Sequence, residues 1–179
     1  NTINSLLEET VKNIFIPVSV GGGIKSIEQI RSLLASGADK VTINSEAVRN
    51  PDLITKTVQE FGSSTISLGV EVIKSTISDD YNILIESGRE KTTKNLKAWV
   101  EKAQTSGVGE IILTSIDNDG LRNGFDLNLV KYIENYVNVP LLIHGGCSSY
   151  QDVYEAFSQT SVSGVIISSV LHYSNLDKA

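Results

Sequence analysis

Two segments of this chain, residues 17–48 and 140–171, carry the same pattern in register and without a gap. Each begins with a proline and an apolar strand, passes through a Gly-Gly turn and a helical stretch, and ends in a second strand with small polar residues. The positions identical in both copies are Pro17/Pro140, Gly22/Gly145, Gly23/Gly146, Ser26/Ser149, Ile43/Ile166 and Ser45/Ser168. A β-turn-α-β unit that occurs twice predicts a fold assembled from repeated units.

The ends of the repeated strands carry residues suited to binding phosphate. Backbone N–H groups and helix N-termini that follow such strands can hold an anion. The residues concerned are Gly22, Gly23, Asn44 and Ser45 in the first copy and Gly145, Gly146, Ser168 and Ser169 in the second. Two sites related by a pseudo-twofold axis would fit a small molecule phosphorylated at both ends. The alternative is architectural, because repeated barrels reuse their unit and glycine often only turns the chain. A role of the glycines in turning the chain would not explain the polar residues at the ends of the second strands, which favours the phosphate sites.

Composition excludes several classes of protein. With 179 residues and 40% hydrophobic residues, the chain can form one domain, residues 1–179, around a core. The net charge of −6 provides no electrostatic footprint for nucleic acid. The sequence contains no run of about 18 apolar residues, so no membrane span is predicted. It also shows no basic segment followed by an apolar one, so secretion is not supported. The single Cys147 excludes an internal disulfide and is compatible with a reducing cytoplasm.

Strand and helix patterns alternate along the chain. Strands are expected at 16–20, 40–44, 65–72, 110–116, 140–144 and 163–168, and helices at about 26–36, 50–60, 93–106, 126–136 and 149–158. A further helical pattern of Ile3, Leu6, Leu7 and Val11 opens the chain. This alternation predicts a parallel sheet with crossover helices. Residues 75–92 interrupt the rhythm and predict a β-hairpin insertion, with Asp79-Asp80 as its turn.

Two architectures accommodate these elements. A doubly wound open sheet would usually form one ligand crevice, whereas a (β/α)₈ barrel gathers every strand end on one face. Because each expected strand ends in glycine or polar residues, the pattern favours the barrel. A barrel needs about 250 residues and eight strands, and this chain contains no methionine. We therefore expect an incomplete barrel with its beginning missing, in which strands 3–8 are present and strands 1–2 are absent.

Four stretches carry a family resemblance. They read VGGGIKSIEQIRSLLASGADKVTINSEAVRNPDLI, FGSSTISLGVEV, GVGEIILTSIDNDGLRNGFDLNLV and IHGG. They resemble the HisF family, the cyclase subunit of imidazole glycerol phosphate synthase, over nearly the whole chain from Pro17 to His172. The sister isomerase of histidine biosynthesis shares the GGG and DG turns, but ADKVTINSEAV and GEIILTSIDNDG with GFDLNL are similar to the cyclase.

The resemblance implies a lyase of histidine biosynthesis. It implies a heterodimer with a HisH-like glutaminase that supplies ammonia, and a phosphoribulosyl-formimino substrate with two phosphates. The products would be imidazole glycerol phosphate and an aminoimidazole ribotide, made without a metal or a cofactor. With its first strands missing, the piece itself is expected to be inactive.

The resemblance also implies roles for individual residues. By matching motif, one phosphate site comprises Gly23, Asn44 and Ser45, and the other comprises Gly146, Ser168 and Ser169 with Asp119 and Gly120. The family's catalytic pair is two aspartates at the ends of strands 1 and 5. The strand-1 residue lies outside this chain, and the strand-5 position is Glu71. The substitution keeps the carboxylate but moves it outward by a methylene, a displacement that can cost about 10²-fold in rate. The alternative for Glu71 is a structural carboxylate paired with Lys40 or Lys74.

Three matched residues belong to the opposite end of the strands. Lys40 and Glu110 match the charged ring through which ammonia enters the family's barrel, and both begin a strand in this sequence. Alternatively, the two residues form an ordinary solvent-exposed salt bridge that contributes little to stability. Asp39 matches a position that faces the partner subunit.

Several departures from the family keep other functions open. Leu121 stands where the family commonly has threonine, and Cys147 follows the second Gly-Gly pair, with His144 before it. A Cys-His pair suggests nucleophilic catalysis, but three residues apart at a strand end we expect these to line a pocket. The departures allow a HisF-like paralogue that delivers ammonia to a sugar in surface-polysaccharide biosynthesis. A non-catalytic barrel that binds phosphorylated ligands is a further alternative.

Overall fold

The computed structural model describes residues 3–173, and they divide into two compact units. Unit 1 consists of the residues up to 69 together with 103–110, and unit 2 consists of residues 70–102 together with those from 111 onward. Strand β3 (Ile66–Lys74) begins in unit 1 and ends in unit 2. Each unit is described by itself below.

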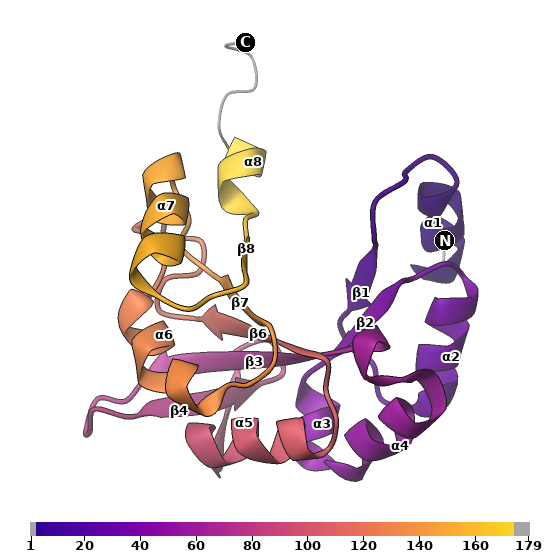
Figure 1. Cartoon of the computed structure of the whole chain (residues 1–179), viewed down its shortest axis with the longest axis horizontal. Helices are drawn as coiled ribbons and strands as arrows, with labels where there is room; N and C mark the ends of the chain where they lie inside the picture. Colours follow the sequence, from indigo (N-terminus) through magenta and orange to yellow (C-terminus); the bar gives the residue numbers. More distant parts are fainter. Residues whose placement is uncertain (1–2, 174–179) are drawn as a thin grey trace. The chain divides into compact units, whose positions relative to one another are not determined.

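Unit 1 is a small parallel sheet with its crossover helices (Figure 1, indigo to magenta). Its elements are α1 (Ile3–Val11), β1 (Ser19–Gly21), α2 (Ile27–Ala35), β2 (Lys40–Ile43), α3 (Ser45–Arg49), α4 (Asp52–Phe61) and η1 (Ser63–Thr65). Strand β2 pairs in parallel with β1 on one side and with β3 on the other. The core is formed by fully buried aliphatic side chains, among them Ile30, Val41, Ile43, Ile54 and Leu68.

Unit 2 repeats the same plan with an antiparallel addition. It contains β4 (Tyr81–Ile85), β5 (Glu90–Asn95), most of α5 (Leu96–Thr105) and of β6 (Glu110–Ser115), α6 (Leu127–Ile133), η2 (Glu134–Tyr136), β7 (Leu141–His144), α7 (Tyr150–Gln159), β8 (Gly164–Ile166) and α8 (Ser169–Tyr173). Strands β6, β7 and β8 pair in parallel in that order. The strand order β1-β2-β3-β6-β7-β8, with a helix after almost every strand, is that of successive (β/α) units.

The predicted alternation is confirmed, and the α/β fold is that of an incomplete (β/α)₈ barrel. All six expected parallel strands are present, as are the expected helices and the opening helix. Strand β1 begins at Ser19 rather than at Ile16, because Pro17 has no N–H group to donate to a ladder. The short helices α3 and α8 were not predicted, since each has only five residues and too few turns to show a periodic pattern.

The segment 75–92, predicted as a hairpin insertion, holds two reversals of the chain. Strand β4 pairs antiparallel with β3, with Lys74 opposite Tyr81, and β5 pairs antiparallel with β4 and continues to Asn95. Asp79 and Asp80 lie in the first connection, which is closed by the Ser75 N–H donating to the Asp80 carbonyl at 2.9 Å. The second connection places Glu86, Ser87 and Gly88 at φ angles of 54°, 58° and 77°.

A cluster of aromatic and charged side chains fastens this addition to α6. The Tyr132 hydroxyl donates to Asp80 Oδ1, and the rings of Tyr132 and Tyr81 lie 5.2 Å apart. Lys97 Nζ lies 4.1 Å from the Tyr132 ring centroid. Burial, followed by the hydrogen bond to Asp80, raises the pKa of Tyr132 to about 12. Its phenol is therefore protonated at neutral pH and serves as a hydrogen-bond donor.

The helices that follow the two Gly-Gly turns start in related ways. Ser26 caps α2 by accepting from the Gln29 N–H at 3.3 Å. Ser149 caps α7 as part of a complete capping box with Asp152. The Asp152 carboxylate also accepts from the N–H and the hydroxyl of Ser148, each at 2.7 Å. The helix of the second copy thus begins with more hydrogen bonds than that of the first.

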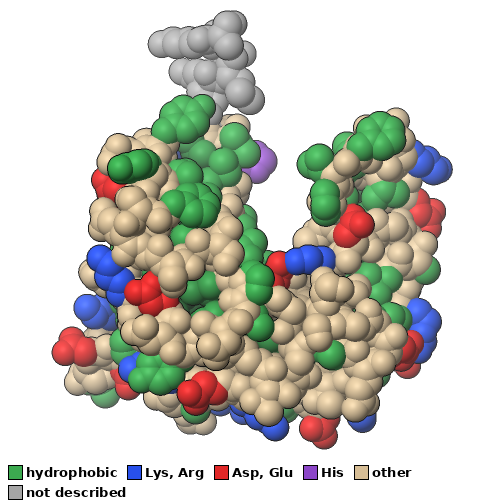
Figure 2. Space-filling view, in the orientation of Figure 1, with side chains coloured by type: hydrophobic (Ala, Val, Ile, Leu, Met, Phe, Trp, Pro, Cys, Tyr) green, Lys and Arg blue, Asp and Glu red, His purple; other side chains and the backbone are tan. Residues whose placement is uncertain are grey.

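Apolar side chains remain exposed on α7. Tyr150, Tyr154 and Phe157 are exposed by 96%, 67% and 49%, and their spacing of four and three residues places them on one side of the helix. Figure 2 shows green side chains gathered over this helix.

Candidate functional site

We call Gly22, Gly23, Asn44 and Ser45 half-site A; all four lie in unit 1. The parallel register of β1 and β2, with Gly21 opposite Thr42, brings the ends of these strands together. The Gly-Gly turn has φ angles of 103° and 67°, a conformation that favours glycine. Asn44 follows β2 and is the N-cap residue of α3, and its Oδ1 atom is buried without a hydrogen-bond partner among the described residues.

We call Gly145, Gly146, Ser168, Ser169, Asp119 and Gly120 half-site B; all six lie in unit 2. The second Gly-Gly turn has φ angles of 99° and 96°, so its backbone resembles that of half-site A. All of these residues except Gly120 meet around one small cavity, whose lining is Asp119, His144, Gly145, Gly146, Cys147, Ile166, Ser168 and Ser169. Gly120, at φ 75°, is exposed in the same loop as Asp119.

The loop that follows β6 closes against the second Gly-Gly turn. The Gly124 N–H donates to the Gly146 carbonyl at 2.9 Å, and the Asn118 amide donates to the Gly124 carbonyl at 2.8 Å. A Cβ atom on Gly146 would lie 2.2 Å from the Gly124 oxygen. Half-site B is therefore built by close backbone approach. Leu121, the departure from the family's threonine, is 65% exposed in this loop.

His144 and Cys147 do not form a catalytic pair. The imidazole contacts the hydroxyls of Thr114 and Ser168, whereas the Cys147 thiol donates to the Ser149 carbonyl at 3.8 Å. Burial, helped by the Asp152 charge, raises the pKa of the Cys147 thiol. A buried, protonated thiol is a poor nucleophile, which agrees with the expected role of lining a pocket.

Glu71 lies in the middle of β3, within unit 2. Its backbone pairs with Leu84 of β4, its side chain is half-buried, and its Oε2 atom is fully buried. The end of the same strand is fixed by the Lys74 N–H donating to Asp117 Oδ2 at 2.7 Å. Lys40, one of the two partners considered for Glu71, is bound to Glu110 instead.

Lys40 and Glu110 form an ion pair in unit 1, and a third residue, Ser67, also binds Glu110. Lys40 Nζ donates to Glu110 Oε2, and the buried Ser67 hydroxyl donates to Glu110 Oε1 at 2.5 Å. The side chains of Lys40 and Glu110 are 36% and 10% exposed, so the pair is not an ordinary solvated salt bridge. Sequence reasoning did not select Ser67. Its polar side chain, at a buried position of an apolar strand, was the available signal.

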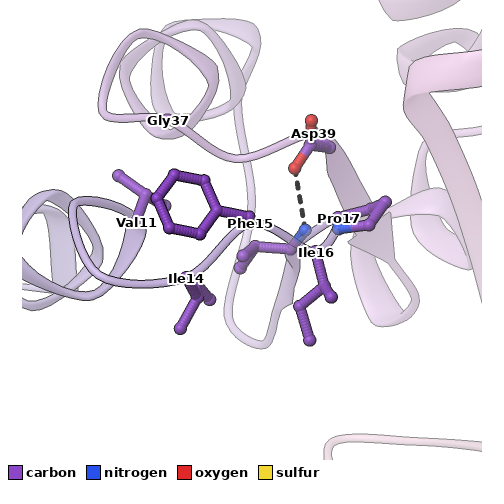
Figure 3. Close-up of a pocket in the computed structure, with 8 residues that line it drawn as sticks. Val11, Ile14, Phe15, Ile16, Pro17, Gly37 and Asp39 are labelled. Carbon is purple, nitrogen blue, oxygen red and sulfur yellow. Dashed lines mark hydrogen bonds between the residues drawn. The ribbon is translucent and has the colours of Figure 1, made fainter.

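Asp39 lies beside an apolar pocket at the start of β2 (Figure 3). The Val18 N–H donates to Asp39 Oδ2 at 2.8 Å, so this carboxylate also fixes the chain entering β1. The pocket is lined by Val11, Ile14, Phe15, Ile16, Pro17, Val18, Gly37 and Asp39. Phe15 and Ile16 are 98% and 71% exposed, and Figure 2 shows hydrophobic side chains over this α1–β1 connection.

Neither a metal site nor a membrane-spanning helix is found among the described residues. Between residues 3 and 173, no three His, Cys, Asp or Glu side chains gather as a metal site would require. No described helix has the length and apolar character of a membrane span.

Comparisons with known proteins place the chain in a family. The model of a family described as histidine biosynthesis protein matches residues 1–177. The chain is 42% identical over 173 residues to the imidazole glycerol phosphate synthase subunit HisF of Prochlorococcus marinus strain MIT 9312, covering 96% of this chain and 68% of that protein. It is 39% identical over 175 residues to the subunit of the same name from Natranaerobius thermophilus, covering 98% and 69%. The chain that carries these two half-sites belongs to the histidine biosynthesis protein family.

Proposed function

We propose that this chain is a HisF-type cyclase of imidazole glycerol phosphate synthase and uses its half-sites to hold a bisphosphorylated substrate. The enzyme class follows from the relatives, which carry this name at about 40% identity over nearly the whole chain. The observation that supports the substrate class is the repetition of one geometry. Both Gly-Gly turns have positive φ angles and both are followed, one strand later, by small polar residues.

The half-sites suit phosphate because of the groups they offer. Backbone N–H groups next to glycines approach an anion closely, and the hydroxyls of Ser45, Ser168 and Ser169 supply further donors. The substrate would be a phosphoribulosyl-formimino compound with a phosphate at each end, one for each half-site.

Glu71 is the residue to which we assign proton transfer during ring closure. Ring closure onto ammonia requires protons to be removed and delivered, and a positioned carboxylate can do both. The position of Glu71 on a strand held by β4 and by Asp117 gives the carboxylate a fixed backbone.

Lys40, Glu110 and Ser67 would form the entrance for ammonia. Glu110 is a buried carboxylate bound from two sides, and removing one partner of such a group is costly because the charge then remains buried and uncompensated. A group held this firmly can define an opening that excludes water while admitting a small neutral molecule.

The ammonia would come from a glutaminase subunit bound over the Phe15–Asp39 pocket. An exposed aromatic side chain beside a carboxylate is a typical anchor of protein interfaces. Phe15→Ala should weaken glutaminase binding by about 10- to 100-fold, measured by titration of the purified partner. Turnover with ammonium should remain unchanged, because ammonium bypasses the partner. Unchanged glutamine-dependent turnover at limiting glutaminase would contradict this docking position.

The proposed catalytic role is tested by Glu71→Gln in the full-length protein, with ammonium as the nitrogen donor. The amide keeps the shape of the side chain but cannot transfer the proton, so kcat should fall by about 10²-fold or more. Binding of the bisphosphate should stay within a few-fold. Glu71→Asp is the matched variant and should raise cyclase turnover if the glutamate is a tolerated replacement of aspartate. If neither variant changes turnover, Glu71 is a structural residue.

A HisF-like enzyme that aminates a sugar is the second candidate. Glu71 and the exposed Leu121 support it, because both depart from the cyclase pattern at residues assigned to the substrate. Absence of cyclase turnover by the full-length parent protein with ammonium would favour this candidate.

A further inference from the structure

His144 has no role in the proposed function, yet its side chain spans three neighbouring strand ends. It is the last residue of β7, directly before the Gly-Gly turn of half-site B. Thr114 of β6 and Ile166 of β8 are its partners in the two parallel ladders. Its Nδ1 atom lies 3.4 Å from Thr114 Oγ1, and its Nε2 atom lies 3.5 Å from Ser168 Oγ. The ring thus reaches from β6 into half-site B.

The two contacts favour one arrangement of protons once an anion is present. A neutral imidazole has one N–H donor and one acceptor nitrogen. The Thr114 hydroxyl can donate to Nδ1, which leaves the N–H on Nε2, the atom nearest Ser168. Both contacts are long for hydrogen bonds, and such contacts commonly shorten when a ligand binds. The N–H on Nε2 then faces the cavity that His144 lines together with Asp119, Ser168 and Ser169.

We propose that His144 is an anion-binding residue of half-site B, which contacts the substrate phosphate through its Nε2 N–H. This inference rests on the proposed function, because it takes half-site B as a phosphate site. It gives this half-site an imidazole donor in addition to its hydroxyls and backbone N–H groups. The residues of half-site A include no comparable group.

Sulfate is the probe of choice, because its charge does not change between pH 5.5 and 8. In the full chain, sulfate should shift the ring resonances of His144 in NMR spectra and leave those of His172 in place. The sequence contains only these two histidines, so the signals can be assigned with two variants. His144→Ala removes this donor, so the affinity for sulfate should fall by about 5- to 10-fold. Sulfate that shifts neither ring would overturn the proposal.

His144→Gln separates loss of the donor from loss of the imidazole ring. Glutamine keeps an N–H donor near the position of Nε2, so sulfate affinity should stay within about twofold of the parent's. His172→Gln is the matched control, since it removes an exposed imidazole of α8, and it should bind sulfate as the parent does. An affinity of His144→Ala equal to that of the parent would contradict the proposal, as would a loss in His144→Gln as large as that in His144→Ala.

Failure of this inference can be told apart from failure of the proposed function. If sulfate reports on His144 but the full-length protein shows no cyclase turnover with ammonium, the anion site stands and the assigned reaction is wrong. If turnover occurs while His144→Ala changes neither the KM of the bisphosphate nor sulfate binding, the reaction stands and the role of His144 is wrong.

Discussion

Half-sites A and B share a backbone turn but differ in what surrounds it. Gly22 and Gly23 are exposed, and a Cβ atom added to either would meet nothing within 4 Å. Gly145 and Gly146 are buried, and added Cβ atoms would lie 2.7 Å from the Ser115 oxygen and 2.2 Å from the Gly124 oxygen. In half-site A glycine is required only for its φ angle, whereas in half-site B it is required for φ and for space.

This difference shows what a repeated sequence preserves. Both copies keep the Gly-Gly turn and the serine that caps the next helix, so the local backbone repeats. The packing around the turn depends on segments outside the repeat. In half-site B the loop of Asn118–Gly124 supplies that packing through its bonds to Gly146. The shared motif therefore predicts a similar backbone in both half-sites, but it does not predict how well each half-site tolerates a substitution.

The largest expected effect comes from Gly146→Ala. The new Cβ would overlap the Gly124 carbonyl, which belongs to the backbone and cannot rotate away, and the φ angle of 96° adds strain. We expect the free energy of unfolding to fall by more than about 3 kcal/mol. Urea denaturation measures this directly. A loss below 1 kcal/mol would show that the loop after β6 moves freely and that half-site B is not preorganised.

A smaller effect is expected from Asp152→Asn, which weakens the capping box of the second copy. Burial raises the pKa of the Asp152 carboxyl, but hydrogen bonds from Ser148 and Ser149 outweigh it and hold the pKa below its ordinary value. A lowered pKa means that the ionised group stabilises the fold above about pH 4, and that this stability is lost as the pH falls further. The variant should be less stable by about 1–2 kcal/mol at pH 7.

The pH dependence checks the same prediction. Between pH 5 and pH 3 the parent should lose more stability than Asp152→Asn, because only the parent has this carboxylate to protonate. Gly23→Ala, in the first copy, is the control and should leave the acid dependence unchanged, because it removes no hydrogen-bonding side chain. Parallel acid curves for the parent and Asp152→Asn would contradict the prediction.

The smallest effect is expected from Gly23→Ala. Its φ angle of 67° lies in the left-handed region, and no atom obstructs the new Cβ. Strain alone should cost about 1 kcal/mol, well below the cost at Gly146. Measured under the same urea conditions, a loss as large as that of Gly146→Ala would remove the difference between the half-sites.

Local patterns predicted most of the fold. Apolar runs and cap residues located the parallel strands and the main helices, because these elements follow from side-chain periodicity. The extent of β5 was missed, since its sequence EKTTKN lacks an apolar face and forms a strand only by pairing with β4. That residues 1–179 form a single domain stays a prediction.

Site contacts were less predictable, because they join residues far apart in the sequence. The Gly-Gly turns and the Lys40–Glu110 pair could be selected from motifs. The bonds of Ser67 to Glu110, of Tyr132 to Asp80 and of His144 to Thr114 could not, since each depends on how separate elements pack. The assigned roles of the site residues, Glu71 above all, stay predictions.

Strand β5 has a consequence for the protein's behaviour at high concentration. Among the described strands only β4 pairs with it, so no described strand covers its other edge. An edge that no strand covers can recruit a strand from another molecule and start aggregation. Lys91 and Lys94 are exposed on β5, and Glu90 lies at its beginning. These charges would have to be desolvated before a second strand could add, and they thereby favour a dispersed protein over strand-mediated assembly.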